Sequence, residues 1–232
     1  MMEIKPEFRS RAVRSFVIRS GRMTDGQKAA FEKHWPVYGL ELNQGLLEQA
    51  RDFGRSSDLI VEIGFGMGDS LLQMCQGDPV ANFVGIEVHP PGVGRIISRA
   101  ALEPVENLRV YMADAKDVLA ECFADRSIDR IQIYFPDPWQ KKKHHKRRLV
   151  QNEFLAILQP KLKSGGILHL ATDWQNYAEH MLAVMESQPR FVNLAGVGQY
   201  SPRPEWRPET KFERRGHKLG HGVWDLIYKL TL

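Results

Sequence analysis

The chain has 232 residues, a formal net charge of +4 and a sequence pI near 9.1, and 43% of its residues are hydrophobic. This composition can bury one sizeable core, but no uninterrupted apolar stretch approaches the roughly 18 residues that span a membrane. The two cysteines exclude a disulfide framework and fit a reducing compartment. No hydrophobic signal core follows the N-terminal charges, so we expect a cytoplasmic protein with no membrane partner.

The positive charge is concentrated in two segments. Residues 1–22 carry a net charge of +4 and residues 141–148 carry +6. Because the whole chain has a net charge of +4, the remaining residues together carry −6. This asymmetry predicts a localised contact with a polyanion, although charged runs are more often ordinary solvated surface. We expect residues 1–40 to form a basic extension, partly flexible and with one helix, and residues 41–232 to form the main domain.

The first expected elements are helices. Thr24 and Gln27 match a capping box for a helix that runs through Trp35, and a second helix is expected from Leu40 to Phe53, ended by Gly54. Strands and helices then alternate. The expected strands are 59–63, 83–88, 108–112, 128–135 and 167–171, and the expected helices are 70–75, 93–102, 116–123 and 149–158.

Repeated β-α units of this length predict a parallel sheet with helices on both faces. The K-S-G-G turn before Ile167 indicates the end of a helix, and residues 223–230 predict a last strand at one edge of the sheet. Residues 188–222 are rich in Pro, Arg and Gly, which predicts a long irregular loop, and loops of that length are usually functional or disordered.

Acidic residues close or follow five successive expected strands. Ligands bind beyond the carboxyl ends of the strands in such a sheet, so these carboxylates predict an acidic ligand site, although any one of them could be a loop residue or a helix cap. The five residues are Glu62, Glu87, Asp114, Asp137 and Asp173.

The segment V-E-I-G-F-G-M-G, residues 61–68, combines a buried strand with a glycine-rich turn. Gly64, Gly66 and Gly68 stand at alternate positions, so bare backbone can approach a ligand closely. The spacing differs from the G-x-G-x-x-G of dinucleotide sites, in which a pyrophosphate lies at the N-terminus of a helix. The turn therefore favours a nucleoside without a phosphate clamp.

Three of the acids suit different parts of such a nucleoside. Glu62 could meet a cation, Glu87 could accept hydrogen bonds from ribose hydroxyls, and Asp114 could accept from the exocyclic amine of an adenine. An acidic rim suits a cationic ligand, which favours S-adenosylmethionine over NAD.

The segment Y-F-P-D-P-W, residues 134–139, is the most specific of the chain. Its two prolines hold the backbone of Asp137 extended, and three aromatic residues surround that carboxylate. Such a site can stack a splayed base while the acid binds the edge of the base, although a rigid turn with core aromatics is the plain alternative. We expect phosphate contacts with RNA from the residues that follow: Lys143, His144, His145, Lys146, Arg147 and Arg148.

No metal site is expected. His144 and His145 are adjacent and point apart in regular structure, and His217 and His221 have ligand spacing without an accompanying set of cysteines or acids.

These motifs resemble those of the bacterial-type tRNA (guanine-N7)-methyltransferase family, and the resemblance covers most of the chain. It rests on R-S-F-V-I-R-S-G-R-M-T (14–24), E-I-G-F-G-M-G, G-I-E-V-H-P-P-G-V-G, Y-F-P-D-P-W, A-T-D-W and T-K-F-E (210–213). It implies a Rossmann-like class I S-adenosylmethionine-dependent methyltransferase, with a mostly parallel seven-stranded sheet, that methylates N7 of guanine-46 in the tRNA variable loop. Gln140 stands where many relatives carry His.

The resemblance also implies roles for single residues. The residues expected to contact the methyl donor or to line its pocket are Glu62, Glu87, Asp114 and Asp137, with the three glycines. The residues expected to hold the substrate guanosine are Lys141, Asp173, Thr210, Lys211, Phe212 and Glu213.

The chemistry itself requires no general base, because guanine N7 has a free lone pair and no proton. We expect Asp137 to orient the guanine and to stabilise the positive charge that develops on its ring, while Asp173 and Glu213 share the remaining guanine donors. Three alternatives stay open: an N-methyltransferase for another RNA or a small-molecule base, an NAD-dependent dehydrogenase, and a non-catalytic RNA-binding module. No obligate protein subunit is implied, and the chain could be a monomer or a homodimer.

Overall fold

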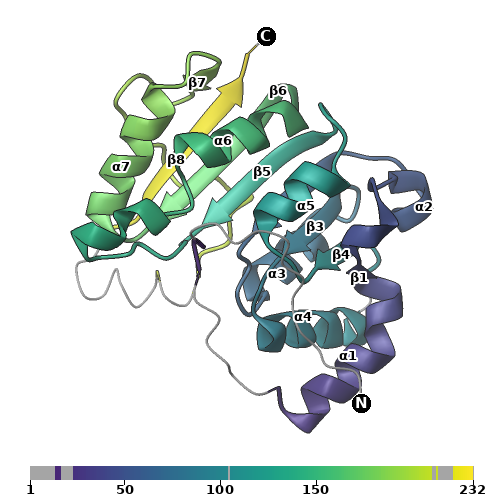
Figure 1. The fold of residues 1–232 in the computed structure, drawn as a ribbon. Helices are drawn as coiled ribbons and strands as arrows, with labels where there is room; N and C mark the ends of the chain where they lie inside the picture. Colours follow the sequence, from purple (N-terminus) through teal and green to yellow (C-terminus); the bar gives the residue numbers. More distant parts are fainter. Residues whose placement is uncertain (1–13, 17–22, 104, 211–212, 214–221, 232) are drawn as a thin grey trace. The chain divides into compact units, whose positions relative to one another are not determined.

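A computed structural model describes residues 14–16, 23–103, 105–210, 213 and 222–231. They form two compact units: unit 1 holds residues 23–124, and unit 2 holds residues 14–16 together with those from 125 onward. Figure 1 traces the elements of each unit. No helix in the described part of the chain is long and apolar enough to cross a membrane.

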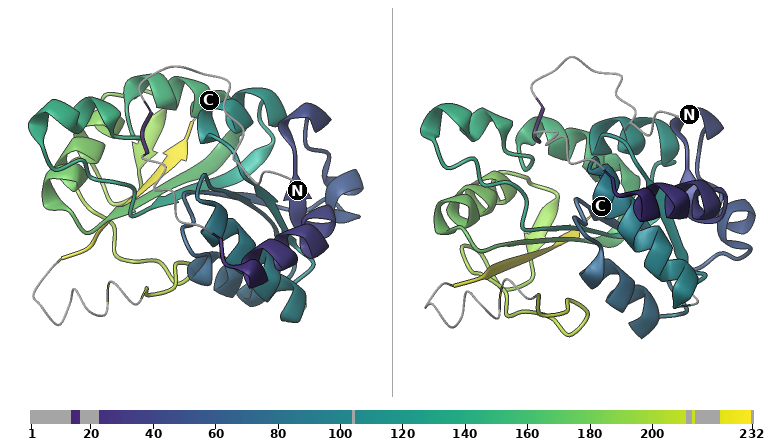
Figure 2. Two further views of the ribbon diagram at one scale, coloured as in Figure 1. Left: turned by 60° about the horizontal axis from the view of Figure 1, so that its bottom comes forward. Right: turned by 90° about the horizontal axis from the view of Figure 1, so that it is seen from below.

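Unit 1 contains four parallel strands in the order β1-β4-β3-β2. Helices α3 and α4 cover one face of these strands and α5 covers the other (Figures 1 and 2), so every residue of β2 and β3 is buried. The strands are β1 (Gly39–Leu40), β2 (Leu59–Ile63), β3 (Asn82–Ile86) and β4 (Leu108–Tyr111). The helices are α1 (Asp25–Tyr38), α2 (Gln49–Phe53), α3 (Asp69–Gly77), α4 (Pro90–Leu102) and α5 (Ala115–Cys122), with a 3₁₀ turn at Leu42–Gln44.

The prediction of one helix from Leu40 to Phe53 was wrong. The segment forms β1, the 3₁₀ turn and the five-residue α2, and it is interrupted at Gly45, which has a φ of 76°. Gly54 ends α2 with a φ of 72°, as was predicted from the preference for glycine at the ends of helices. Helix α1 continues to Tyr38, beyond the predicted end, and the Tyr38 hydroxyl donates to the carbonyl of Ala100 in α4 at 3.0 Å.

Unit 2 contains four strands in the order β5-β6-β8-β7, of which β5 and β6 are parallel. Strand β8 is antiparallel to both of its neighbours. Figure 2 shows α6 and α7 on one side of these strands. The strands are β5 (Ile128–Tyr134), β6 (Leu162–Thr172), β7 (Phe191–Asn193) and β8 (Trp224–Leu230). The helices are α6 (Asn152–Leu158), α7 (Gln175–Glu186) and the 3₁₀ segments Lys142–Arg147 and Gln159–Lys161.

Two predictions for unit 2 need correction. The K-S-G-G turn lies inside β6 instead of ending a helix, because a shift in register accommodates it: Ile128 pairs with Leu162, whereas Arg130 pairs with Ile167. Strand β8 is not at an edge, because the short β7 forms within the segment that was expected to be a loop. Eight strands are described where the resemblance implied seven, and the two that were not predicted by position are β1 and β7.

Candidate functional site

The glycine motif forms the turn between β2 and α3 in unit 1. Gly64, Gly66 and Gly68 have φ values of 78°, 58° and 78°, a region that favours glycine. A Cβ on Gly64 or Gly66 would meet none of the described atoms within 4 Å, so the space beside these two residues is open. A Cβ on Gly68 would instead lie 2.7 Å from Ile96 of α4, so the missing side chain at this position serves helix packing.

Glu87 follows β3 and shapes the same turn. Its Oε2 accepts a hydrogen bond from the Gly66 N–H at 2.8 Å, and its Oε1 accepts from Val88 N–H at 2.6 Å and His89 N–H at 3.0 Å. Burial raises the pKa of this carboxyl, and the three backbone hydrogen bonds offset part of the rise. A carboxylate has about four acceptor positions, so Glu87 retains capacity for one hydroxyl donor.

The other two acids of unit 1 differ in exposure. Glu62 lies within β2 and is only 3% exposed. Asp114 is half-buried and caps α5, since its Oδ1 accepts from the Lys116 N–H at 3.0 Å. Sequence reasoning missed Gly92 of α4, where a Cβ would collide with the carbonyl of Gly66, so a side chain there would displace the glycine turn.

Asp137 is exposed on the loop after β5 in unit 2. Phe135 and Trp139, on either side of the P-D-P segment, have φ values of 50° and 48°, which L-residues adopt at a cost of about 1–2 kcal/mol each. The neighbouring structure holds this conformation. The Phe135 N–H donates to the carbonyl of Ala171 at 2.8 Å, and Arg148 Nε donates to the carbonyl of Pro138 at 2.9 Å.

Arg148, which was expected to contact RNA, is buried at 3% exposure and is turned toward the protein. Its Nη2 donates to Asn176 Oδ1 at 2.7 Å, and its guanidinium carbon lies 4.8 Å from the centroid of the Tyr177 ring. Arg148 therefore fixes the Asp137 loop against α7. Burial raises the pKa of Tyr177 to about 12, so this ring beneath the guanidinium stays neutral.

The 3₁₀ segment Lys142–Arg147 separates the basic run into faces, because side chains three residues apart align. His144 and Arg147 share the face that meets Trp139: the His144 ring contacts the indole edge-on at 5.9 Å, and the Arg147 guanidinium carbon lies 3.9 Å from its centroid. Lys143 and Lys146 share another face and are exposed. The pKa of His144 is lowered by desolvation and by the surrounding cations, so this ring is neutral near pH 7.

Residues 14–16 lie against the same loop. The carbonyls of Arg14 and Phe16 accept from Arg147 at 3.1 Å and 3.3 Å, and that of Ser15 accepts from the Trp139 indole N–H at 3.0 Å. Arg147 is thus committed to protein acceptors in this arrangement, which the charge of the run did not indicate.

Asp173 is exposed directly after β6 and lines a cavity of about 470 Å³. The other lining residues are Trp174, Gln175, Asn176, Glu179, Gly222 and Trp224. Lys141 is exposed immediately before the 3₁₀ segment.

Thr210 and Glu213 form a reciprocal pair. The Thr210 N–H donates to Glu213 Oε2 at 2.7 Å, and the Glu213 N–H donates to Thr210 Oγ1 at 3.1 Å, which is the geometry of a capping box. The predicted site residues Lys211 and Phe212 lie outside the described residues, as do Lys5, Arg9, Arg11, Arg19, Arg22, His217 and His221.

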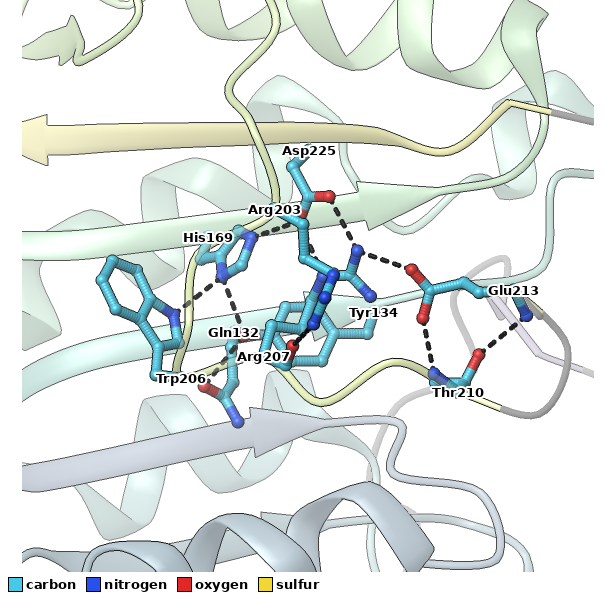
Figure 3. A network of polar contacts seen from close by, with 9 residues as sticks. All are labelled: Gln132, Tyr134, His169, Arg203, Trp206, Arg207, Thr210, Glu213 and Asp225. Atoms are coloured by element: carbon cyan, nitrogen blue, oxygen red, sulfur yellow. Dashed lines mark hydrogen bonds and ion pairs between the residues drawn. The ribbon is translucent and has the colours of Figure 1, made fainter. Parts of the chain in front are cut away.

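A buried polar network lies beside this pair (Figure 3). Arg207 joins the carboxylates of Glu213 and Asp225, and Asp225 accepts from His169 Nε2 at 2.7 Å. Strand register explains why these side chains meet, since His169 pairs with Gln132, and Ala171 pairs with both Tyr134 and Asp225, so the polar side chains share one face. Sequence reasoning missed this network.

The chain is similar to known methyltransferases. A family model described as "Putative methyltransferase" matches residues 56–226. The tRNA (guanine-N(7)-)-methyltransferase of Saccharophagus degradans is 59% identical over 99% of this chain and 100% of the relative. The protein of the same name from Alcanivorax borkumensis is 57% identical over 94% of this chain and 92% of the relative.

Solved structures show the same fold at low identity. The 16S rRNA methyltransferase KamB has a TM-score of 0.56 and 16% identity, covering 93% of this chain and 99% of the other. A variant of the 16S rRNA (adenine(1408)-N(1))-methyltransferase of Catenulisporales acidiphilia, with its cosubstrate SAM, has a TM-score of 0.53 and 14% identity, covering 83% of this chain and 92% of the other. The predicted α/β, Rossmann-like class I methyltransferase fold is therefore confirmed.

Proposed function

Because the chain belongs to the tRNA (guanine-N(7)-)-methyltransferase family, we propose that it transfers a methyl group from S-adenosylmethionine to N7 of a guanine in tRNA, at position 46 of the variable loop. The observation that carries the proposal is the high identity to relatives of that name over nearly their whole length. A tRNA substrate suits the localised positive charge of this chain and a cytoplasmic location. The division into a basic extension over residues 1–40 and a methyltransferase domain over residues 41–232 remains part of the proposal.

We assign the methyl donor to unit 1. The open space beside Gly64 and Gly66 fits a nucleoside that packs against bare backbone, and Glu87 has the acceptor capacity for a ribose hydroxyl. Glu62 and Asp114 complete the proposed acidic lining. S-adenosylmethionine, when bound, supplies a methyl group on a cationic sulfur, and positive charge favours a pocket of carboxylates.

We assign the guanine to the exposed carboxylates of unit 2. Asp137 is held on a loop with two residues at positive φ, so its position is set before substrate arrives. We propose that it accepts hydrogen bonds from the guanine N1–H and N2–H and stabilises the positive charge that develops on the ring. We further propose that Asp173 shares the donors of the guanosine and that Lys141, which is exposed, contacts the adjoining phosphate.

For the RNA backbone we propose Lys143 and Lys146, which are exposed, with His144 and His145 beside them as hydrogen-bonding groups. Arg147 can bind a phosphate as well only if its hydrogen bonds to the carbonyls of Arg14 and Phe16 are broken.

Mapping the methylated nucleotide tests this function. The protein is incubated with an unmodified tRNA transcript and methyl-labelled S-adenosylmethionine, and the labelled nucleotide is identified after digestion. Label at N7 of the variable-loop guanine is expected, and a transcript with adenine at that position should remain unlabelled. Label elsewhere in the RNA, or transfer only to free bases, would replace this function with the alternative N-methyltransferase.

A further inference from the structure

Arg207 is almost completely buried, at 1% exposure, and its guanidinium pairs with two carboxylates. Its Nε and Nη2 donate to Oδ1 and Oδ2 of Asp225 at 2.7 Å and 2.8 Å, which is a bidentate pair. Its Nη2 also lies 2.7 Å from Glu213 Oε1. One guanidinium therefore connects β8 to the segment that carries Thr210 and Glu213.

Each carboxylate oxygen of Glu213 has a partner. Oε1 pairs with Arg207 Nη2, and Oε2 accepts from the Thr210 N–H. The side chain is only 2% exposed. Glu213 is thus tied to Thr210 on one side and to Arg207 on the other.

The other end of the connection is fixed by a neutral histidine. The Trp206 indole N–H, which can only donate, lies 3.2 Å from His169 Nδ1, so Nδ1 is unprotonated and Nε2–H donates to Asp225 (Figure 3). Burial lowers the pKa of His169, more than Asp225 raises it, which agrees with this assignment. The hydrogen bond from His169 therefore fixes the carboxylate of Asp225 in the position where it pairs with Arg207.

Arg207 also contacts the loop of Asp137. Its guanidinium carbon lies 5.5 Å from the centroid of the Phe135 ring and 5.7 Å from that of Tyr134. Its Nη1 has no hydrogen-bond partner in the described part of the chain.

We propose that Arg207 is a positioning residue for methyl transfer, which holds Glu213, its partner Thr210 and the Phe135 end of the Asp137 loop in the arrangement that aligns the substrate guanosine. The inference rests on the proposed function. Lysine cannot replace arginine here, because a single ammonium does not reproduce the fork that reaches both carboxylates.

Arg207→Lys and Asp225→Asn test the proposal from the two ends of the pair. Each variant is titrated with S-adenosylhomocysteine by calorimetry to count binding-competent protein, and single-turnover methylation of tRNA is then measured at saturating RNA. We expect the rate per binding-competent molecule to fall on the order of 100-fold, because a misplacement of the reacting groups by about 1 Å lowers the rate by about that factor. The dissociation constant for tRNA should stay within about 3-fold of wild type, because phosphate contacts dominate that affinity.

The matched control is Arg203→Lys. Arg203 is exposed, and within the described residues its side chain donates to the carbonyl of Arg207 at 2.8 Å, so this variant should keep the wild-type rate. If Arg207→Lys does not fold, Asp225→Asn alone carries the test, because it preserves side-chain volume and one acceptor oxygen.

Two results would overturn the inference. One is a wild-type rate in a folded Arg207→Lys or Asp225→Asn variant. The other is a loss of rate that disappears when it is expressed per competent molecule, since that would leave Arg207 with a role in stability only. Failure of the proposed function is detected separately, because the wild-type protein would then label a different nucleotide. The rates of the same variants are in that case compared at that nucleotide.

Discussion

Gly64→Ala should weaken binding of the methyl donor far more than it destabilises the protein. Gly64 has a φ of 78°, and a Cβ on it would meet none of the described atoms within 4 Å. The substitution therefore strains the backbone by about 1–2 kcal/mol but creates no collision within the described protein. The lower entropy of the unfolded chain offsets roughly 0.4–1 kcal/mol, which leaves a net destabilisation of about 1 kcal/mol. For a chain of this size that lowers Tm by about 2–4 °C.

Gly54→Ala is a matched control for the backbone strain. Gly54 has a φ of 72° at the end of α2, and a Cβ there would likewise meet none of the described atoms within 4 Å. The two substitutions should lower Tm by similar amounts. Only at Gly64 would the added methyl group occupy space that we assign to the nucleoside, so only Gly64→Ala should weaken S-adenosylhomocysteine binding.

Calorimetric titration with S-adenosylhomocysteine measures the difference. We expect the dissociation constant of Gly64→Ala to rise at least tenfold, which corresponds to about 1.4 kcal/mol, while that of Gly54→Ala stays near the wild-type value. Equal dissociation constants in the two variants would refute the assignment of the donor to this turn, whatever their melting temperatures.

Asp137→Asn should lower single-turnover methylation by roughly 100-fold, the usual effect of removing one preorganised electrostatic group, and an unchanged rate would exclude Asp137 from the reaction. The free energy of unfolding should fall as the pH drops below about 6.5, because burial lowers the pKa of His169 in the folded chain and the unfolded chain therefore binds more protons. Urea denaturation of His169→Gln should show a flatter dependence over that range, and an equal slope would contradict this origin. Replacing Lys143 and Lys146 together by alanine should lower the salt slope of tRNA binding by about 1.4–1.8, whereas Lys161→Ala, which removes a cation already paired with Asp125, should leave it unchanged.

Local patterns predicted the parts of the molecule that depend on neighbouring residues. The glycine turn and the alternation of strands and helices from residue 59 onward follow from periodicity and from glycine conformation, and these elements lie close to their predicted positions. The sequence could not show that Gly68 serves packing on Ile96 while Gly64 faces open space, because that difference depends on α4.

Pairings between distant segments were the part that sequence reasoning missed. Arg207 and Asp225 meet only because β8 inserts between β6 and β7, and the irregular segment before β8 gave no periodic signal. One local signal was present: T-K-F-E has the T-x-x-E pattern of a capping box, which predicts a structural role for Glu213. The segment was instead expected to hold the substrate guanosine.

The basic run presents fewer exposed cations than its charge suggests. Its two arginines are turned toward the protein: Arg148 is buried against α7, and Arg147 donates to the carbonyls of residues 14–16. The planar guanidinium suits such fixed, multiple hydrogen bonds, whereas the hydrated ammonium of lysine favours solvent. The exposed cations of this run are therefore the lysines, at positions 141, 142, 143 and 146. If RNA binds without displacing residues 14–16, the run neutralises four phosphates at most, and its share of the salt slope is about 3–4 instead of the larger value that six cations would give.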